Sequence, residues 1–426
     1  MSLTESPQNR LLWSLAIAIF ALVFYRFQFA APLENSTHND FKHLYLGGRL
    51  LWRGEDPYLE ESLRAEASEV RHPDLRYLNP YVYPPFTGYL FGWLGRMDYE
   101  RATQVWFWFN QACLIGALLL LAGGLSGFSP LAKTAFLLGS VCYSFPLYRA
   151  IDAGQLDHFL LLMLSLILFL WRNGWKKSAA AVIALATLVK VVPGFLGLWL
   201  LWKREWPALG VGIFTGFLLI LGPGVVFGLN PYFDYLPIVL QMGYGSSTWA
   251  DAGNAFYVDP GNIGFPALVF RLFHENLRTE PWLDLGFLAK GLCYLWGLGI
   301  LIGCLACCRI QRRDEDPEME LGVWILGMLL IPSLFWDHYL ILALPAWVVL
   351  ASRLAGNGVN NGILGLAAAC WAIACVWVQW ANPAYLSGSG MLMLNLPLPG
   401  ILILFALGFW MAKTGRMPEA PARVQL

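Results

Sequence analysis

The sequence predicts an all-α integral membrane protein, a bundle of about ten spanning helices whose large polar loops share one face. Apolar residues make up 58% of the 426-residue chain and charged residues only 13%. The apolar residues recur in long runs as far as the C-terminus, which is typical of membrane spans rather than of a globular core. A polar, charged and aromatic segment, residues 35–101, follows the first of these runs. The net charge of zero argues against nucleic acid as a partner, since that function needs a basic surplus.

Ten stretches of the chain are candidates for full spans. They are residues 10–30, 104–123, 131–147, 157–171, 206–228, 285–308, 321–336, 338–353, 362–380 and 397–412. A further apolar stretch, residues 178–202, has basic residues at both ends, so a single crossing would put one basic flank outside. We therefore expect this stretch to be a re-entrant pair of short helices, broken around Lys190 and Pro193.

This arrangement divides the loops between two faces of the membrane. Basic residues that include the 172–177 loop, Lys203 and Arg353 become cytoplasmic, as the positive-inside rule requires. Residues 31–103 and 229–284 become two large loops on the outer face, the periplasmic or extracellular side of a bacterial-type plasma membrane. The chain is then one membrane-embedded domain, residues 1–426, and the first outer loop is the place where we expect chemistry.

Short elements are predicted within the outer loops. Residues 40–53 form an amphipathic helix that Gly54 ends, and residues 59–70 form a charged amphipathic segment suited to a headgroup layer. Residues 79–85 are aromatic and rich in proline, so they cannot form a regular helix. The second outer loop is rich in turn residues and ends in a short amphipathic run, residues 265–273.

Ionisable side chains at or near membrane depth are candidates for function, because placing them in lipid is costly. Asp40 begins the predicted outer helix and is the first candidate, although an aspartate there is also a common N-cap. Lys190, at the break of the helix pair, could reach a phosphate in a cavity or simply extend to the membrane interface. Asp337 and His338 lie between two apolar runs, where a histidine can donate to a phosphate oxygen or belong to a tight interfacial turn.

Another polar group crowds the short outer turn predicted between the third and fourth spans. Its members are Arg149, Asp152, Gln155, Asp157 and His158. Capping of a helix start accounts for one of the two acids but not for the whole group. The eight cysteines instead fall in apolar runs without histidine at metal-ligand spacing, so we expect them to pack between helices and predict no metal site.

Several stretches, in order along most of the chain, resemble family 87 of the glycosyltransferases, which are polytopic enzymes of the GT-C type. They are Asp40-Phe41, Gly54 to Tyr58, Tyr81 to Pro85, Gly154-Gln155, Lys190 to Pro193, Gly261 to Gly264 with Arg271, and Phe335 to Tyr339. Asp157 and His158 depart from the pattern, which has an asparagine after the Gly-Gln pair. The resemblance implies an inverting transfer of a hexose, chiefly mannose, from a polyprenyl-phosphate donor to a glycolipid or glycan acceptor, with no cofactor and with membrane lipids as surroundings.

The resemblance also implies roles for individual residues. Asp40 would be the general base that takes the proton of the acceptor hydroxyl. Neither large outer loop carries an Asp-x-Asp motif for a metal-bound nucleotide sugar, so the leaving phosphate would be met by side-chain donors. Candidate phosphate ligands, in falling order, are His338, Arg149 and Lys190. The other residues predicted to line the substrate site are Gln155, Asp337, Tyr83 and Asn262.

A transporter or a flippase for lipid-linked sugars is the alternative function. Lys190 and the Asp337-His338 pair would then form a substrate or proton site. The sequence has no evident internal repeat, and its polar residues concentrate in the outer loops rather than in the spans. A non-catalytic scaffold would leave these polar groups without a role. The resemblance and the distribution of polar residues favour an enzyme.

Overall fold

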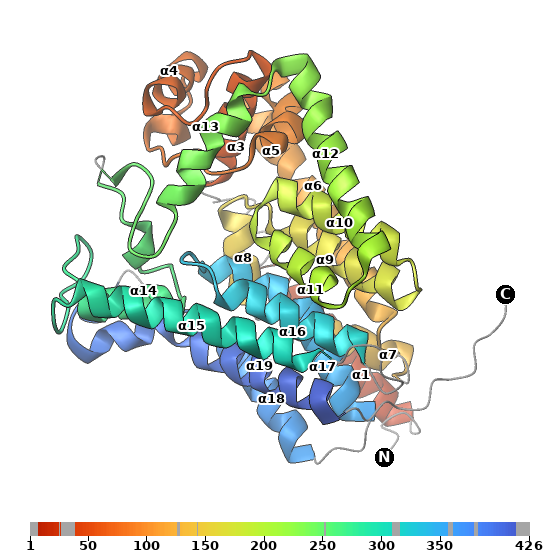
Figure 1. The fold of residues 1–426 in the computed structure, drawn as a ribbon. Coiled ribbons are helices and arrows are strands. Elements are labelled where there is room, and N and C mark those ends of the chain that lie inside the picture. The colour runs from red at the N-terminus through yellow and green to blue at the C-terminus, as the bar shows by residue number, and fades with distance from the viewer. Residues whose placement is uncertain are drawn as a thin grey trace.

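The computed structural model describes residues 7–24, 26, 39–125, 128–142, 144–250, 253–308, 316–356, 361–378 and 382–414. In these ranges the regular elements are all helices, and the only extended pairings are two isolated β-bridges. Helices α14, α15, α16, α19 and α18 run side by side in one part of the molecule (Figure 1). Helices α6, α9, α10 and α12 form a second group, and the short outer-loop helices α3, α4, α5 and α13 lie together at one end (Figure 1). The all-α class is confirmed.

A helix occupies each of the ten predicted span regions. These helices are α1 (Pro7–Phe24), α6 (Tyr99–Ala122), α7 (Pro130–Cys142), α9 (Asp157–Arg172), α12 (Trp206–Phe227), α15 (Gly286–Cys307), α16 (Pro317–Leu330), η7 (Asp337–Ala343) with α17 (Leu344–Gly356), α18 (Asn361–Ala374) and α19 (Pro397–Thr414). Five helical segments of the described chain are long and apolar enough to cross a membrane: 99–122, 206–227, 286–307, 337–356 and 397–414. The membrane-protein class therefore agrees with the structure, whereas the count of ten full spans stays a prediction.

Three of the predicted spans end earlier than expected, and one of them, 362–380, stops at Ala374. The predicted span 131–147 stops at Cys142, and a separate helix, α8 (Phe145–Asp152), follows. This new start has a local cause: the Ser144 hydroxyl accepts a hydrogen bond from the Leu147 amide, and Pro146 occupies the first turn. The predicted span 321–336 stops at Leu330, because the proline that follows at position 332 cannot continue a helix.

The outer loops contain more helix than the sequence indicated. The shorter elements are α3 (Phe41–Trp52), α4 (Glu60–Val70), η2 (Pro73–Arg76), α5 (Pro85–Phe91), η3 (Gly92–Arg96), α13 (Asn230–Gln241), η6 (Phe256–Val258), α14 (Phe265–Phe273), η8 (Pro383–Tyr385) and η9 (Gly388–Asn395). The predictions for 40–53, 59–70 and 265–273 correspond to α3, α4 and α14, and residues 79–84 are irregular as expected. Helix α13, in the second outer loop, was not predicted.

Helix α3 is buried on nearly every side rather than along one stripe. Lys42 and His43 are buried with its apolar residues, and a Cβ atom on Gly47 would collide with the Tyr81 ring. Arg49 pairs with the buried Glu66 carboxylate and so holds α4 onto α3. The amphipathic helix therefore forms where it was predicted, and the aromatic segment around Tyr81 covers part of the face that the sequence left polar.

Residues 178–202 form the pair of short helices that was expected. Helix α10 (Lys176–Val189) ends at Lys190, whose backbone is extended, and η4 (Val192–Gly194) leads into α11 (Phe195–Trp202). The Lys176 ammonium at the start of α10 pairs with the carboxylate of Glu205, just after α11. The two ends of the segment therefore meet, and Lys190 lies at its turn. Its re-entrant position in a membrane stays a prediction.

Ion pairs gather at the end of the molecule where Lys176 and Glu205 meet. Arg172 lies 2.9 Å from Glu318, Lys203 lies 3.0 Å from Glu320, and Arg353 contacts Asp316 and Glu318. The basic members of these pairs come from three separate segments that the positive-inside rule assigned to one side of the membrane. The structure places them together, which supports the predicted relative topology.

This topology can be tested with single cysteines in a cysteine-free background. Glu61 on α4 and Asn173 after α9 are both exposed, and they lie in loops assigned to opposite faces. We expect a cysteine at position 61 to react with an impermeant thiol reagent added outside intact cells. A cysteine at position 173 should react only after the membrane is opened. Labelling in the opposite sense would invert the assignment of the outer face.

Candidate functional site

The Asp40 side chain is directed at another segment of the chain and does not cap its own helix. Asp40 occupies the N-cap position of α3, yet its carboxylate makes no capping hydrogen bond. It accepts a hydrogen bond of 2.5 Å from Nε2 of Gln155 instead, and its side chain remains partly exposed. The structure therefore does not support the alternative that Asp40 serves only as a helix cap.

The turn that presents Gln155 requires the glycine before it. Gly154 adopts a φ of +67°, and a Cβ atom there would lie 2.7 Å from the Cβ atom of Phe41. The carbonyl of Gly154 accepts a 2.7 Å hydrogen bond from the Trp106 indole, while the Asp40 amide donates to the Ala153 carbonyl at 2.9 Å. The turn is thus pressed against the start of α3, which brings the Gly-Gln pair to the carboxylate.

The Gln155 side chain links three predicted site residues. Its Nε2 donates to Asp40 and lies 3.4 Å from Nε2 of His338. Its Oε1 accepts a 3.4 Å hydrogen bond from the hydroxyl of Tyr83. Burial raises the pKa of Tyr83 well above its ordinary value, so this phenol stays protonated and remains a donor.

His338 is held from its other side by a buried carboxylate. Its Nδ1 bonds to Oδ2 of Asp157, and Oδ1 of Asp157 accepts a 3.1 Å hydrogen bond from the Lys190 ammonium. That ammonium also lies 3.8 Å from the ring centroid of Tyr339. The positive charge of Lys190 is therefore compensated inside the protein rather than carried to the membrane interface. The contact with Asp157 fixes the imidazole so that Nε2 faces Gln155.

Arg149 and Asp337 form a second charged group beside the first. The Arg149 guanidinium lies 2.9 Å from Asp152 and 3.5 Å from Asp337. The Asp337 carboxylate also accepts a 2.7 Å hydrogen bond from the His338 amide and so fixes the start of η7. Helix α8 packs against η7 around these contacts.

The charges of this cluster act on Asp40. Burial raises the pKa of Asp40 above its ordinary value of 3.8. The positive charges of His338, Arg149 and Lys190, together with the hydrogen bond from Gln155, oppose this rise without cancelling it. All three predicted phosphate ligands are therefore close enough to Asp40 to influence its protonation.

Asn262 differs from the other predicted residues because its side chain is engaged by the backbone. Its Nδ2 donates to the carbonyl of Ser333 at 2.9 Å, and its Oδ1 accepts from the amide of Phe335 at 3.0 Å. Its main chain forms an antiparallel bridge with Trp336. The structure thus places Asn262 as a support for the segment that leads to His338, and substrate binding by its side chain stays untested.

The position of Asp157 at the centre of the cluster was not predicted. In the sequence, Asp157 was noted as a member of a crowded turn and as a departure from the family pattern, yet it is fully buried between His338 and Lys190. The signal was present in the chain, because two basic residues at membrane depth require a nearby acid. Arg271 is a second case: it is fully buried and bonds to Asn395 at 2.7 Å, a partner so distant in sequence that no spacing predicts it.

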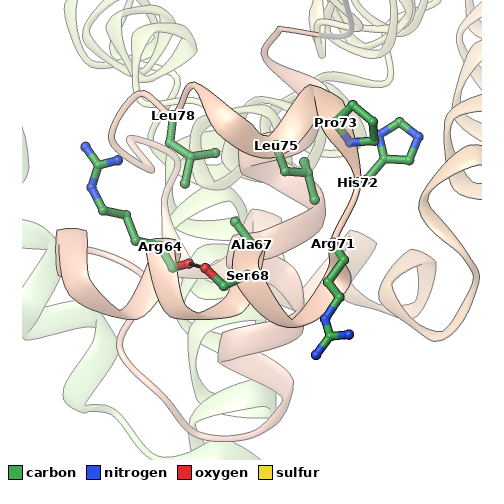
Figure 2. Close-up of a pocket in the computed structure, with 8 residues that line it drawn as sticks. All are labelled: Arg64, Ala67, Ser68, Arg71, His72, Pro73, Leu75 and Leu78. Carbon is green, nitrogen blue, oxygen red and sulfur yellow. Dashed lines mark hydrogen bonds between the residues drawn. The ribbon is translucent and has the colours of Figure 1, made fainter.

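A pocket of about 390 Å³ lies between α4 and η2, apart from this cluster (Figure 2). Its lining residues are Arg64, Ala67, Ser68, Arg71, His72, Pro73, Leu75 and Leu78. Arg64 and Arg71 point away from each other at its two ends, and Leu75 and Leu78 project into its middle (Figure 2). None of the predicted site residues lines it.

The described residues hold no group of three or more His, Cys, Asp or Glu side chains arranged for a metal ion. The seven cysteines whose side chains the structure describes are free thiols, and all except Cys308 are buried. Packing between helices therefore accounts for them as predicted. Metal-independent chemistry remains an expectation.

Comparison with known proteins identifies a family. The model of glycosyltransferase family 87 matches residues 81–336, which is more than half of the chain. This range includes Tyr83, Arg149, Gln155, Lys190 and Asn262. Asp40 precedes it, and the pair that begins η7 follows it directly. No curated protein matches the chain.

Proposed function

Because the chain belongs to glycosyltransferase family 87, we propose that it transfers a hexose, chiefly mannose, from a polyprenyl-phosphate donor to a glycolipid or glycan acceptor at the outer face of the membrane. Family membership makes it a membrane glycosyltransferase and so favours an enzyme over a transporter. One observation carries the finer proposal. A single amide, that of Gln155, contacts both the carboxylate of Asp40 and the imidazole of His338.

The Asp40 carboxylate is the proposed general base. It is partly exposed, it makes no capping bond, and the bond from Gln155 fixes its direction. In the transfer, the acceptor oxygen gives its proton to Asp40 and bonds to the anomeric carbon of the donor sugar. The carbon–oxygen bond to the phosphate breaks, its electron pair leaves with the phosphate, and the configuration inverts. A carboxylate positioned in this way contributes about 10²–10⁴-fold to the rate.

His338 is the proposed ligand of the leaving phosphate. Its Nδ1 is bonded to the Asp157 carboxylate, so Nε2 is the ring nitrogen that is left to face a phosphate oxygen. Lys190 compensates the charge of Asp157 and adds positive potential to the same site. Arg149 pairs with two carboxylates. It therefore acts on the leaving phosphate through its positive charge more than through a direct hydrogen bond.

We expect Asp40→Asn to reduce sugar transfer by at least about 10²-fold. The substitution removes the base but keeps an amide oxygen that can accept the bond from Gln155, so folding should be unchanged. The assay is transfer of radiolabelled mannose from polyprenyl-phosphate mannose in washed membranes. Glu61→Gln, an exposed acid on the same outer loop, is the matched control and should stay active. Transfer at the wild-type rate by Asp40→Asn would remove this residue from the mechanism.

The rate should also depend on pH through Asp40. A general base works only when deprotonated, and burial raises the pKa of Asp40 above 3.8, so kcat/KM should fall at acidic pH with a midpoint above that value. The bond from Gln155 lowers the pKa of Asp40, so Gln155→Leu should move the midpoint to higher pH. If the midpoint is the same in the variant, the fall of kcat/KM at acidic pH does not come from protonation of Asp40.

For the leaving phosphate, we expect His338→Ala to lower turnover by about 10²–10³-fold, the usual cost of losing one donor at a developing charge. EDTA should leave the wild-type rate unchanged. Loss of activity in EDTA that divalent ions restore would contradict metal-independent transfer. If the His338→Ala enzyme is fully active, Arg149 or Lys190 is the ligand of the leaving phosphate instead.

A further inference from the structure

Trp336 lies beside the proposed phosphate ligand and is partly exposed. Its ring is nearly parallel to that of His338, with an interplanar angle of 10° and a centroid distance of 6.5 Å. The Trp336 backbone is fixed by the bridge to Asn262. The backbone of Gly261 lies alongside the indole, since a Cβ atom there would be 3.4 Å from its six-membered ring. The indole is therefore held in one place at the edge of the site.

The indole N–H of Trp336 has no acceptor among the residues that the structure describes. Several other tryptophans donate this proton to a protein acceptor. They are Trp52, Trp106, Trp202, Trp296, Trp324, Trp347 and Trp371. Trp336 thus combines a rigid aromatic surface with a donor that the fold does not use. Ligand sites commonly pair an aromatic wall with a few convergent polar groups.

We propose that Trp336 forms one wall of the subsite for the donor sugar. A pyranose ring has a face of C–H groups, which packs against the electron-rich face of an indole, and a rim of hydroxyls, one of which can accept from Nε1. The donor sugar is the group bonded directly to the phosphate, and Trp336 is the ring next to the proposed phosphate ligand. This inference rests on the proposed function. It gives Trp336, which had no role so far, a ligand of stated chemical class, a pyranose.

The contribution of the sugar can be isolated by measuring binding without turnover. The protein is the purified full chain carrying Asp40→Asn, and the two probes are polyprenyl-phosphate mannose and polyprenyl phosphate without sugar. Trp336→Ala should weaken binding of the sugar-bearing lipid by about tenfold and leave the sugar-free lipid unaffected. Trp336→Phe keeps an aromatic face and should retain most of the affinity. Trp282→Ala, at an exposed tryptophan of the second outer loop, is the matched control.

The outcomes separate this inference from the function on which it rests. Weaker binding of the sugar-bearing lipid alone, restored by phenylalanine, supports the subsite. Equal weakening of both lipids, or no change for either, overturns it while leaving the donor class intact. If the parent protein binds neither lipid, the proposed donor class is itself wrong, and the sugar subsite falls with it.

Discussion

The ionic contact of Asp157 with Lys190 and His338 is the constraint on which the site depends. Asp157 is fully buried, and a buried carboxylate is tolerated only when charge and hydrogen bonds compensate it. Its partners come from the turn of the α10–α11 pair and from the start of η7, so one contact joins three segments that are remote in sequence. Removing Asp157 would leave the Lys190 ammonium without its carboxylate, and the orientation of the imidazole would be lost with it.

The parts of the fold that follow from local patterns could be predicted from the sequence. Helix α14 begins and ends where its amphipathic run does, and the helix pair breaks at Lys190, where a proline follows closely. The surroundings of α3 could not be predicted, because its polar face is covered by the Tyr81 segment through tertiary contacts. The separate helix α8 was missed because a serine cap within an apolar run is a weak signal.

The candidate site, too, could be predicted from the sequence only in part. Residue types that are costly in a membrane identified Asp40, Lys190 and His338. The structure joins Asp40 and His338 through Gln155, and His338 and Lys190 through Asp157. Asn262 shows the limit of such reasoning. Its amide is an equally good candidate in the sequence, but its bonds to main-chain groups of the 333–335 segment exist only in the folded chain. A residue type indicates what chemistry is available, whereas tertiary contacts decide whether a side chain is already engaged.

The α10–α11 pair begins and ends at the same place, as the contact between Lys176 and Glu205 requires. In the re-entrant position that the positive-inside rule predicts, such a segment would leave the order of faces along the rest of the chain unchanged. Such an element could be gained or lost during evolution without inverting a single loop. It also carries Lys190, so a chain without the pair would need another cation for Asp157 or a neutral residue in its place. The helix pair and the acid that it neutralises therefore depend on each other.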